Sequence, residues 1–100
     1  SVKVETEKRL YPQNGVLKLP VTYANVDKVE ATIWKQNENS SEYTNTAFRQ
    51  ELDMSGETND FSLNGQEAGS YCLKITASKT EGESIRTIME VPYYFIITNE

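Results

Sequence analysis

The chain of 100 residues contains no histidine and one cysteine, Cys72. The absence of histidine excludes Ser-His-Asp and Cys-His catalysis and removes the commonest ligand of transition metals. A lone cysteine forms no disulfide within the chain, so the inter-sheet bridge of antibody domains is excluded. Cysteine usage therefore does not decide between an oxidising and a reducing compartment. We therefore expect no catalytic residue, no cofactor and no metal site, and a protein that is not an enzyme.

Positive charge is also scarce. Ten Lys and Arg stand against fifteen Asp and Glu, which gives a net charge of −5. The basic residues are scattered, whereas phosphate binding and docking on anionic lipid both need a basic surface. No run of about 18 apolar residues is present, so nothing predicts a membrane span. We expect no nucleic-acid partner and no direct membrane insertion.

The size of the chain predicts a single domain over residues 1–100. The chain opens Ser1-Val2-Lys3-Val4, without Met and without the pattern of a signal peptide. We interpret it as an excised or processed piece of a larger protein.

Alternation of apolar and polar residues is the strongest pattern present, and turn residues recur about every ten positions. Helical periodicity is lacking. The pattern predicts seven strands and hence an all-β, seven-stranded antiparallel β-sandwich, immunoglobulin-like or fibronectin type III-like, with a small barrel as the alternative. The expected strands lie near 2–4 and at 17–23, 28–35, 47–54, 61–63, 71–78 and 84–98.

Three residues refine this expectation. Pro20 removes a ladder donor inside the second strand, which indicates an edge position or a bulge, and Pro92 is expected to break the last strand. Tyr71 begins a late strand just after Gly69. That is the local pattern of a sandwich corner, in which the phenol hydroxyl bonds nearby backbone.

Trp34 is the aromatic residue of greatest interest. Strict alternation places it with Thr32 on the polar face, where it would stack on a sugar ring or fill a partner's pocket together with Tyr43, Tyr93 or Tyr94. A one-residue bulge would instead turn it into the core. We favour burial, or cover by a neighbouring domain, over a glycan site.

The segment 93–97, Tyr-Tyr-Phe-Ile-Ile, is apolar on both faces. It is interpreted either as a strand buried on both sides or as the seam against a following domain. Cys72 is interpreted as a partly exposed strand thiol with no base nearby. The candidate interface consists of Trp34, Tyr93, Tyr94, Phe95 and Ile97.

Carboxylates are plentiful, which raises two candidates for an acidic site: a pair of acids that hydrolyses glycosides, and a calcium loop. Paired acids hydrolyse glycosides but need a cleft, so a solvated surface is the better interpretation. Asp53, Glu57, Asn59 and Asp60 do not have the spacing of an EF-hand calcium loop. The order Asn-Gly-Gln-Glu at 64–67 lacks the Cys of the Cys-Gly-Glu-Gln thioester motif, so no thioester is predicted.

Four segments carry a resemblance. They are Leu-Pro-Val-Thr-Tyr-Ala-Asn-Val-Asp-Lys-Val-Glu-Ala-Thr-Ile-Trp-Lys at 19–35, Phe-Ser-Leu at 61–63, Gly69-x-Tyr71-x-Leu73, and Phe-Ile-Ile-Thr at 95–98. Together they resemble the fibronectin-like macroglobulin domains of bacterial α2-macroglobulin-like proteins, especially the large envelope proteins of the Bacteroides group. The resemblance covers roughly residues 15–98.

The resemblance implies a non-catalytic building block of a large protease-trapping protein. Its partners would be neighbouring domains of the same chain and, through the full-length protein, target proteases. Its location would be the cell envelope, periplasmic or surface-exposed. The alternative is a carbohydrate-binding or adhesive immunoglobulin-like module of a secreted or surface polysaccharide-processing protein. That alternative predicts two or three coplanar exposed aromatics, Trp34 among them.

Overall fold

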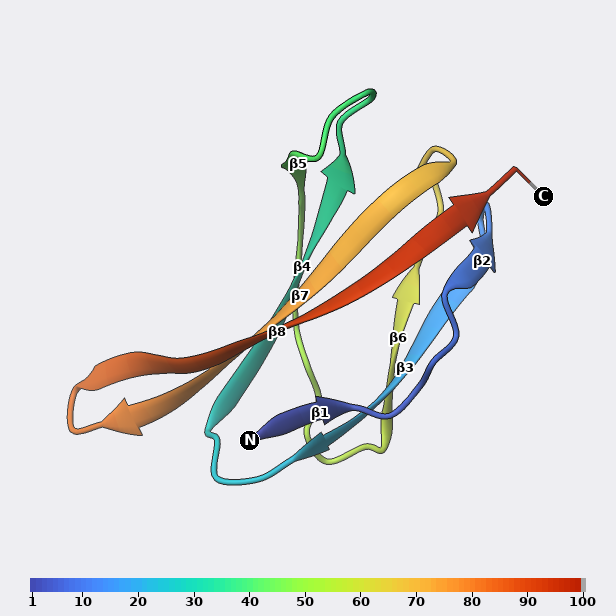
Figure 1. The fold of residues 1–100 in the computed structure, drawn as a ribbon. Coiled ribbons are helices and arrows are strands. Elements are labelled where there is room, and N and C mark those ends of the chain that lie inside the picture. The colour runs from blue at the N-terminus through green and yellow to red at the C-terminus, as the bar shows by residue number, and fades with distance from the viewer. Residues whose placement is uncertain (100) are drawn as a thin grey trace.

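The computed structural model describes residues 1–99, which form eight strands and, over that range, no helix (Figure 1). The strands are β1 (Val2–Val4), β2 (Leu10–Pro12), β3 (Val16–Tyr23), β4 (Lys28–Gln36), β5 (Tyr43–Glu51), β6 (Thr58–Ser62), β7 (Gly69–Glu81) and β8 (Ser84–Thr98).

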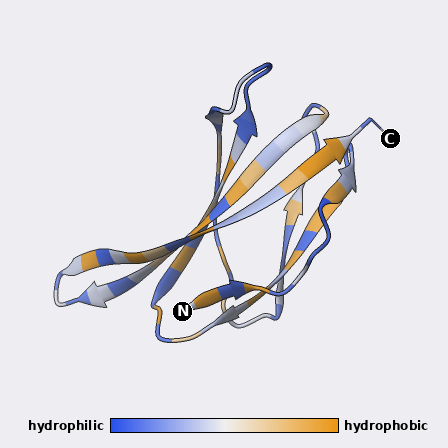
Figure 2. Ribbon diagram, in the orientation of Figure 1, coloured by the Kyte–Doolittle hydropathy of each residue, from blue (hydrophilic) through white to orange (hydrophobic). Residues whose placement is uncertain are grey.

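The strands build two sheets, one of three strands in the order β1-β3-β6 and one of five in the order β2-β8-β7-β4-β5. Hydrophobic and hydrophilic residues alternate along the strands, as the orange and blue bands of the ribbon in Figure 2 show, and the buried apolar residues of both sheets form one core. Leu19 and Phe61 come from the smaller sheet, and Leu73, Ile75 and Phe95 from the larger. Burial of each such side chain contributes about 1.5–3 kcal/mol. The prediction of an all-β sandwich is confirmed.

Eight strands are present where seven were expected, because no strand was predicted over Leu10–Pro12. β2 pairs in parallel with the end of β8, Leu10 opposite Ile96 and Pro12 opposite Thr98. A three-residue strand is too short to show alternation. Its central residue, Tyr11, is buried, and its hydroxyl lies 2.7 Å from the hydroxyl of Tyr93 on β8. This buried phenol pair fastens β2 to the larger sheet.

Pro20 lies neither on an edge strand nor at a bulge, so the prediction was wrong: β3 is the middle strand of its sheet, and its register with β1 and β6 has no shift. β1 ends at Val4, opposite Val21. At the next position the Glu5 N–H donates to the Pro20 carbonyl at 2.8 Å, and Pro20 has no N–H to return. A proline is tolerated there because the neighbouring strand ends at that point.

Pro92 does not break β8, which runs without interruption from Ser84 to Thr98. The Ile96 N–H donates to the Arg9 carbonyl at 2.7 Å, away from β7. Backbone groups four residues apart on a strand face the same side, so the missing N–H of Pro92 also faces away from β7. No hydrogen bond between β7 and β8 is lost.

β7 and β8 extend beyond the sandwich as a two-stranded arm, at the lower left of Figure 1. We expected a turn over 79–83, but the strands continue until Glu81 pairs with Ser84. Ile85 near the tip is 64% exposed, and Arg86 forms an ion pair with Glu81 at 2.6 Å. Among residues 1–99, neither strand of the arm pairs with a second strand here, because β4 begins at Lys28, opposite Ser78.

β5 begins earlier than the predicted 47–54 and is irregular in the middle. Its register with β4 shifts between Thr32 and Trp34. Ala47 takes a φ of +71°, and its N–H bonds the Asn45 side-chain oxygen at 2.8 Å. The irregularity still lets Phe48 pack edge-on against Phe61, with ring centroids 5.9 Å apart.

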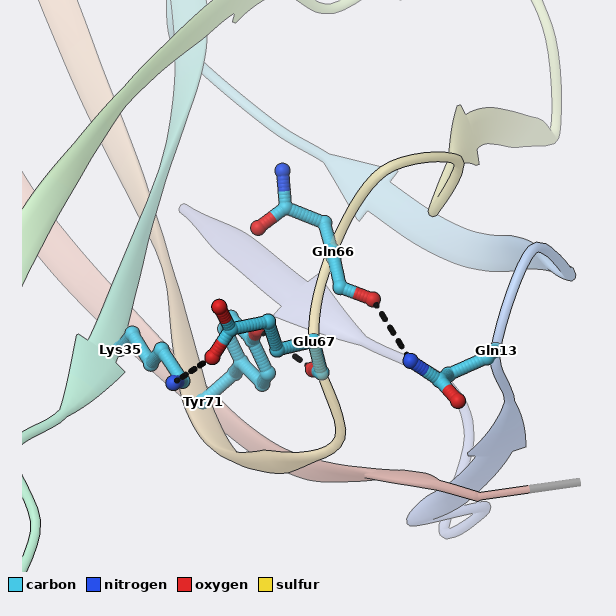
Figure 3. Close-up of polar contacts among 5 residues, drawn as sticks. All are labelled: Gln13, Lys35, Gln66, Glu67 and Tyr71. Carbon is cyan, nitrogen blue, oxygen red and sulfur yellow. Dashed lines mark hydrogen bonds and ion pairs between the residues drawn. The ribbon is translucent and has the colours of Figure 1, made fainter.

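The corner predicted at Tyr71 is confirmed, and Figure 3 shows its contacts. The Tyr71 hydroxyl donates to the Glu67 carbonyl at 2.7 Å, and burial raises the pKa of this phenol. The Lys35 ammonium lies 3.1 Å from the Glu67 carboxylate, a hydrogen bond that raises the pKa of Lys35. The Gln13 side chain donates to the Gln66 carbonyl at 3.4 Å. Residues 64–68, the corner loop, are thereby held to β4, to β7 and to the turn that follows β2.

Candidate functional site

The outer face of the five-stranded sheet carries the exposed Tyr94 and the half-buried Trp34 and Tyr43. The register places Trp34 of β4, Cys72 of β7 and Tyr94 of β8 in one row across the sheet. Two residues after Trp34 on β4, in the direction of the corner loop, Gln36 pairs with Tyr43 of β5. Strand pairing therefore gathers side chains that lie up to sixty residues apart in the sequence.

Trp34 lies on this outer face and not in the core, so core burial through a bulge was wrong, whereas cover by a neighbouring domain, the other part of our preference, stays a prediction. The register shift next to Trp34 is taken up by β5, and Trp34 keeps the phase of Thr32. Its indole N–H donates to the Thr32 hydroxyl at 3.0 Å. The Lys74 ammonium stands 4.2 Å from the ring centroid, within reach of a cation–π interaction. The ring is half-buried and one of its faces is occupied.

Four side chains toward the end of this sheet form a connected apolar surface, which we call the outer patch: Leu10, Tyr43, Tyr94 and Ile96. Leu10 lies opposite Ile96, and the rings of Tyr43 and Tyr94 are 6.1 Å apart. Leu10 is 57% exposed, Tyr94 54% and Ile96 43%. The patch borders a shallow hollow of about 340 Å³, whose lining includes Arg9, Gln36 and Ser70. Exposed apolar side chains that touch one another mark an interaction surface more often than isolated ones do.

Three of the five interface residues expected from the sequence lie in the core. Tyr93, Phe95 and Ile97 are each at most 2% exposed. They occupy the inward phase of β8, where a neighbouring domain has no access to them. Of the five candidates, Trp34 and Tyr94 reach the surface, and Ile96, which is not among them, shares the outward phase of Tyr94. Alternation along residues 93–97 places Ile96 on the same face as Tyr94, so the sequence already indicated that Ile96 is exposed.

Cys72 is buried beneath the aromatic row, not partly exposed as we expected. The thiol is 2% exposed, with Trp34 and Tyr94 on the strands to either side. Burial raises the pKa of this thiol, so the neutral form is favoured over the nucleophilic thiolate. The position is therefore one of packing, not of covalent chemistry.

This burial predicts that Cys72 is inert in the folded protein. At pH 8, alkylation by iodoacetamide is expected to be at least about tenfold slower in the native state than in urea, since reaction requires local opening. Mass spectrometry of timed aliquots measures both rates. A Tyr94→Ala variant, which uncovers one side of the thiol, is expected to react faster than the parent. Equal rates for folded and unfolded parent protein would contradict the buried placement.

In the acidic segment 53–60, the candidate calcium loop, Asp53 and Asn59 already form hydrogen bonds within the protein. Asp53 accepts from the Ser55 hydroxyl at 2.6 Å and from the Ser55 N–H at 2.9 Å, and these bonds lower the pKa of Asp53. Asn59 is buried, accepts from the Asp53 N–H at 2.9 Å and donates to the Tyr23 hydroxyl at 3.1 Å. Within residues 1–99, no group of three or more His, Cys, Asp or Glu side chains is placed to hold a metal ion.

Comparisons with known proteins add no assignment, since the chain matches no protein-family model, no curated protein and no solved structure. Residues 1–99 include no helix of the length and apolar character needed to cross a bilayer. The feature that bears on function is therefore the outer face of the larger sheet.

Proposed function

We propose that this chain is a non-catalytic structural module that packs against a neighbouring domain through the outer patch. The observation that carries the proposal is the contiguous exposure of Leu10, Tyr94 and Ile96 on one face of the five-stranded sheet. Side chains of this kind are favoured at the centre of protein interfaces, where burial against a partner removes apolar surface from water.

We further propose that the sandwich is of the immunoglobulin-like or fibronectin type III-like kind. Two features support this assignment. The sheets have three and five strands, with the late strand β7 central in the larger one. The hydroxyl of Tyr71 bonds the backbone four residues upstream, as in the tyrosine corner of such domains.

Within this class, the resemblance of residues 19–35 and 95–98 favours a macroglobulin-like domain of a bacterial α2-macroglobulin-like protein. The first segment runs from Leu19 in β3 through residues 24–27 to Lys35 in β4, and the second lies at the end of β8. Under this proposal the module is part of the frame of a protease-trapping protein of the cell envelope. Its direct partners are neighbouring domains, and target proteases are met only through the full-length protein.

The ring geometry bears on the alternative, a carbohydrate-binding or adhesive module. A sugar platform of the kind expected has two or three coplanar exposed rings. The planes of Tyr43 and Tyr94 are tilted by 58°, and Lys74 occupies one face of Trp34. Both observations favour a protein partner over a glycan.

A matched pair of substitutions tests the docking role in a polypeptide that contains this module together with its adjacent domains. Tyr94→Ser within the outer patch is expected to weaken the association between domains at least about tenfold, or about 1.4 kcal/mol. Val16→Ser is the control, because Val16 is 49% exposed on the other sheet. Calorimetric unfolding of the linked domains measures the loss of coupling.

Two results would overturn the docking role. One is an unchanged coupling in Tyr94→Ser. The other is binding of a glycan array by the parent module that disappears in Trp34→Ala, with the fold retained in that variant. The second result would establish the carbohydrate-binding alternative.

A further inference from the structure

Two turns that each contain an Asn-Gly step meet at one end of the sandwich. Asn14-Gly15 lies between β2 and β3, and Asn64-Gly65 begins the corner loop. The Leu63 N–H donates to the Gly15 carbonyl at 3.0 Å, and the Gly65 N–H points at the Asn14 side-chain oxygen at 3.5 Å. Both asparagines are exposed. The same dipeptide therefore occurs twice in neighbouring but different surroundings.

An Asn-Gly step has a characteristic reaction. The backbone nitrogen of the glycine loses its proton and attacks Cγ of the asparagine carboxamide. The new C–N bond closes a succinimide ring as the amide C–N bond breaks and ammonia leaves with the proton. Water then opens the ring at either carbonyl and yields aspartate or isoaspartate. Glycine favours the attack because it has no side chain and adopts many backbone angles.

The surroundings of Asn14 oppose this reaction. The attacking nitrogen would be that of Gly15, whose N–H is already bound to the Pro12 carbonyl at 3.1 Å. The turn is also tightly packed, since a Cβ on Gly15 would lie only 2.9 Å from that carbonyl oxygen. Attack on the Asn14 carboxamide therefore requires the turn to open first. Because only the small fraction of molecules with an open turn reacts, the observed rate is lowered to that fraction.

The turn at Asn64 is closed by the Gln66 N–H, which donates to the Leu63 carbonyl at 3.2 Å, but the two reacting groups are less restrained than at Asn14. Within residues 1–99, no group forms a hydrogen bond with the Asn64 carboxamide. Gly65 is exposed, with no atom within 4 Å of the position that a Cβ would take. Its N–H makes only the 3.5 Å contact with Asn14. Nucleophile and carboxamide are thus both available without unfolding.

We propose that Asn64 is a site of spontaneous deamidation in the folded protein, whereas Asn14 reacts only when the chain opens. The reaction replaces a neutral amide by a carboxylate three residues before Glu67. The isoaspartate product also inserts a methylene into the backbone of the corner loop. Conversion therefore places new negative charge and a longer chain beside the Lys35–Glu67 ion pair and the Tyr71 corner.

The two sites are measured separately in one sample, because tryptic cleavage places Asn14 in the peptide 10–18 and Asn64 in the peptide 50–74. The folded protein and the protein in urea are incubated side by side at pH 8 until both peptides of the unfolded chain have converted. Digests are scored for a gain of about one dalton. Conversion in the folded protein is expected to be at least about tenfold faster at Asn64 than at Asn14, with comparable rates in urea.

The variants Asn64→Gln and Asn14→Gln assign the mass gain, because Gln reacts far more slowly by this route. Equal conversion of the two sites in the folded protein would overturn the proposal, as would faster conversion at Asn14. It would also be overturned if neither site converted in the folded protein while both converted in urea.

Discussion

Phe95→Ala is expected to cost about 3–5 kcal/mol of the free energy of unfolding, the largest effect of any single substitution considered. Phe95 is 2% exposed. Its ring stacks on Tyr71 at 5.5 Å and on Tyr93 at 5.9 Å, and meets Tyr11 edge-on at 5.8 Å. Truncation removes the centre of this aromatic group and leaves a cavity that three rigid rings cannot close.

A loss of that size is a large share of the 5–15 kcal/mol that stabilises a typical domain. Urea unfolding followed by tryptophan fluorescence measures it. Tyr94→Ala is the matched control, because the neighbouring residue of β8 points outward and is 54% exposed; its expected cost is below about 1 kcal/mol. Similar costs for the two variants would mean that β8 does not place 93, 95 and 97 inward as described.

Stability is expected to fall steeply above about pH 10, the second large effect. Burial raises the pKa values of Tyr11, Tyr23 and Tyr71 above the ordinary 10.0 of a phenol, and the bond to Tyr93 raises that of Tyr11 further. In the unfolded chain these phenols lose their protons near pH 10, whereas in the folded protein they keep them to a higher pH. The unfolded state then binds fewer protons than the native state, so stability is full below pH 10 and declines as pH rises.

Each phenol that stays neutral in the folded state removes about 1.4 kcal/mol per pH unit above 10. Phenolate absorbance and circular dichroism, recorded together against pH, measure the effect. We expect the buried phenols to ionise in one cooperative step that coincides with loss of β-structure. Tyr11→Phe is expected to reduce the pH dependence by one proton. Gradual ionisation of all six tyrosines without loss of structure would contradict the prediction.

Much of the fold follows from alternation alone. The inward phases of Leu17 and Leu19, of Val29 and Ile33, and of Leu73 and Ile75 are visible in the printed sequence, and those side chains are buried. Errors occur where pairing overrides a local signal. Proline is a strong breaker in isolation, yet Pro92 is tolerated because its nitrogen faces an edge, and no local pattern reports which side of a strand lacks a neighbour.

The candidate site shows the same contrast between what local alternation predicts and what the pairing of distant strands decides. The exposed ring of Tyr94 and the outward phase of Trp34 follow from counting, but the inclusion of Tyr93, Phe95 and Ile97 treated both faces of β8 as surface. Leu10 was missed because its place beside Ile96 depends on a parallel pairing between strands more than eighty residues apart. Contacts of that kind are set by the whole topology and not by the residues that make them.

The pairing of β2 with the end of β8 also bears on how the molecule forms. Residues 10–12 remain without their neighbour until 96–98 arrive, so almost the whole chain has to be looped before the larger sheet is complete. Loop closure over such a span is entropically costly, and sandwiches rich in distant pairings fold in milliseconds to seconds. During synthesis the module therefore completes its fold only after its last strand has left the ribosome. Until then Tyr11 and Tyr71 lack the rings of Tyr93 and Phe95 that cover them.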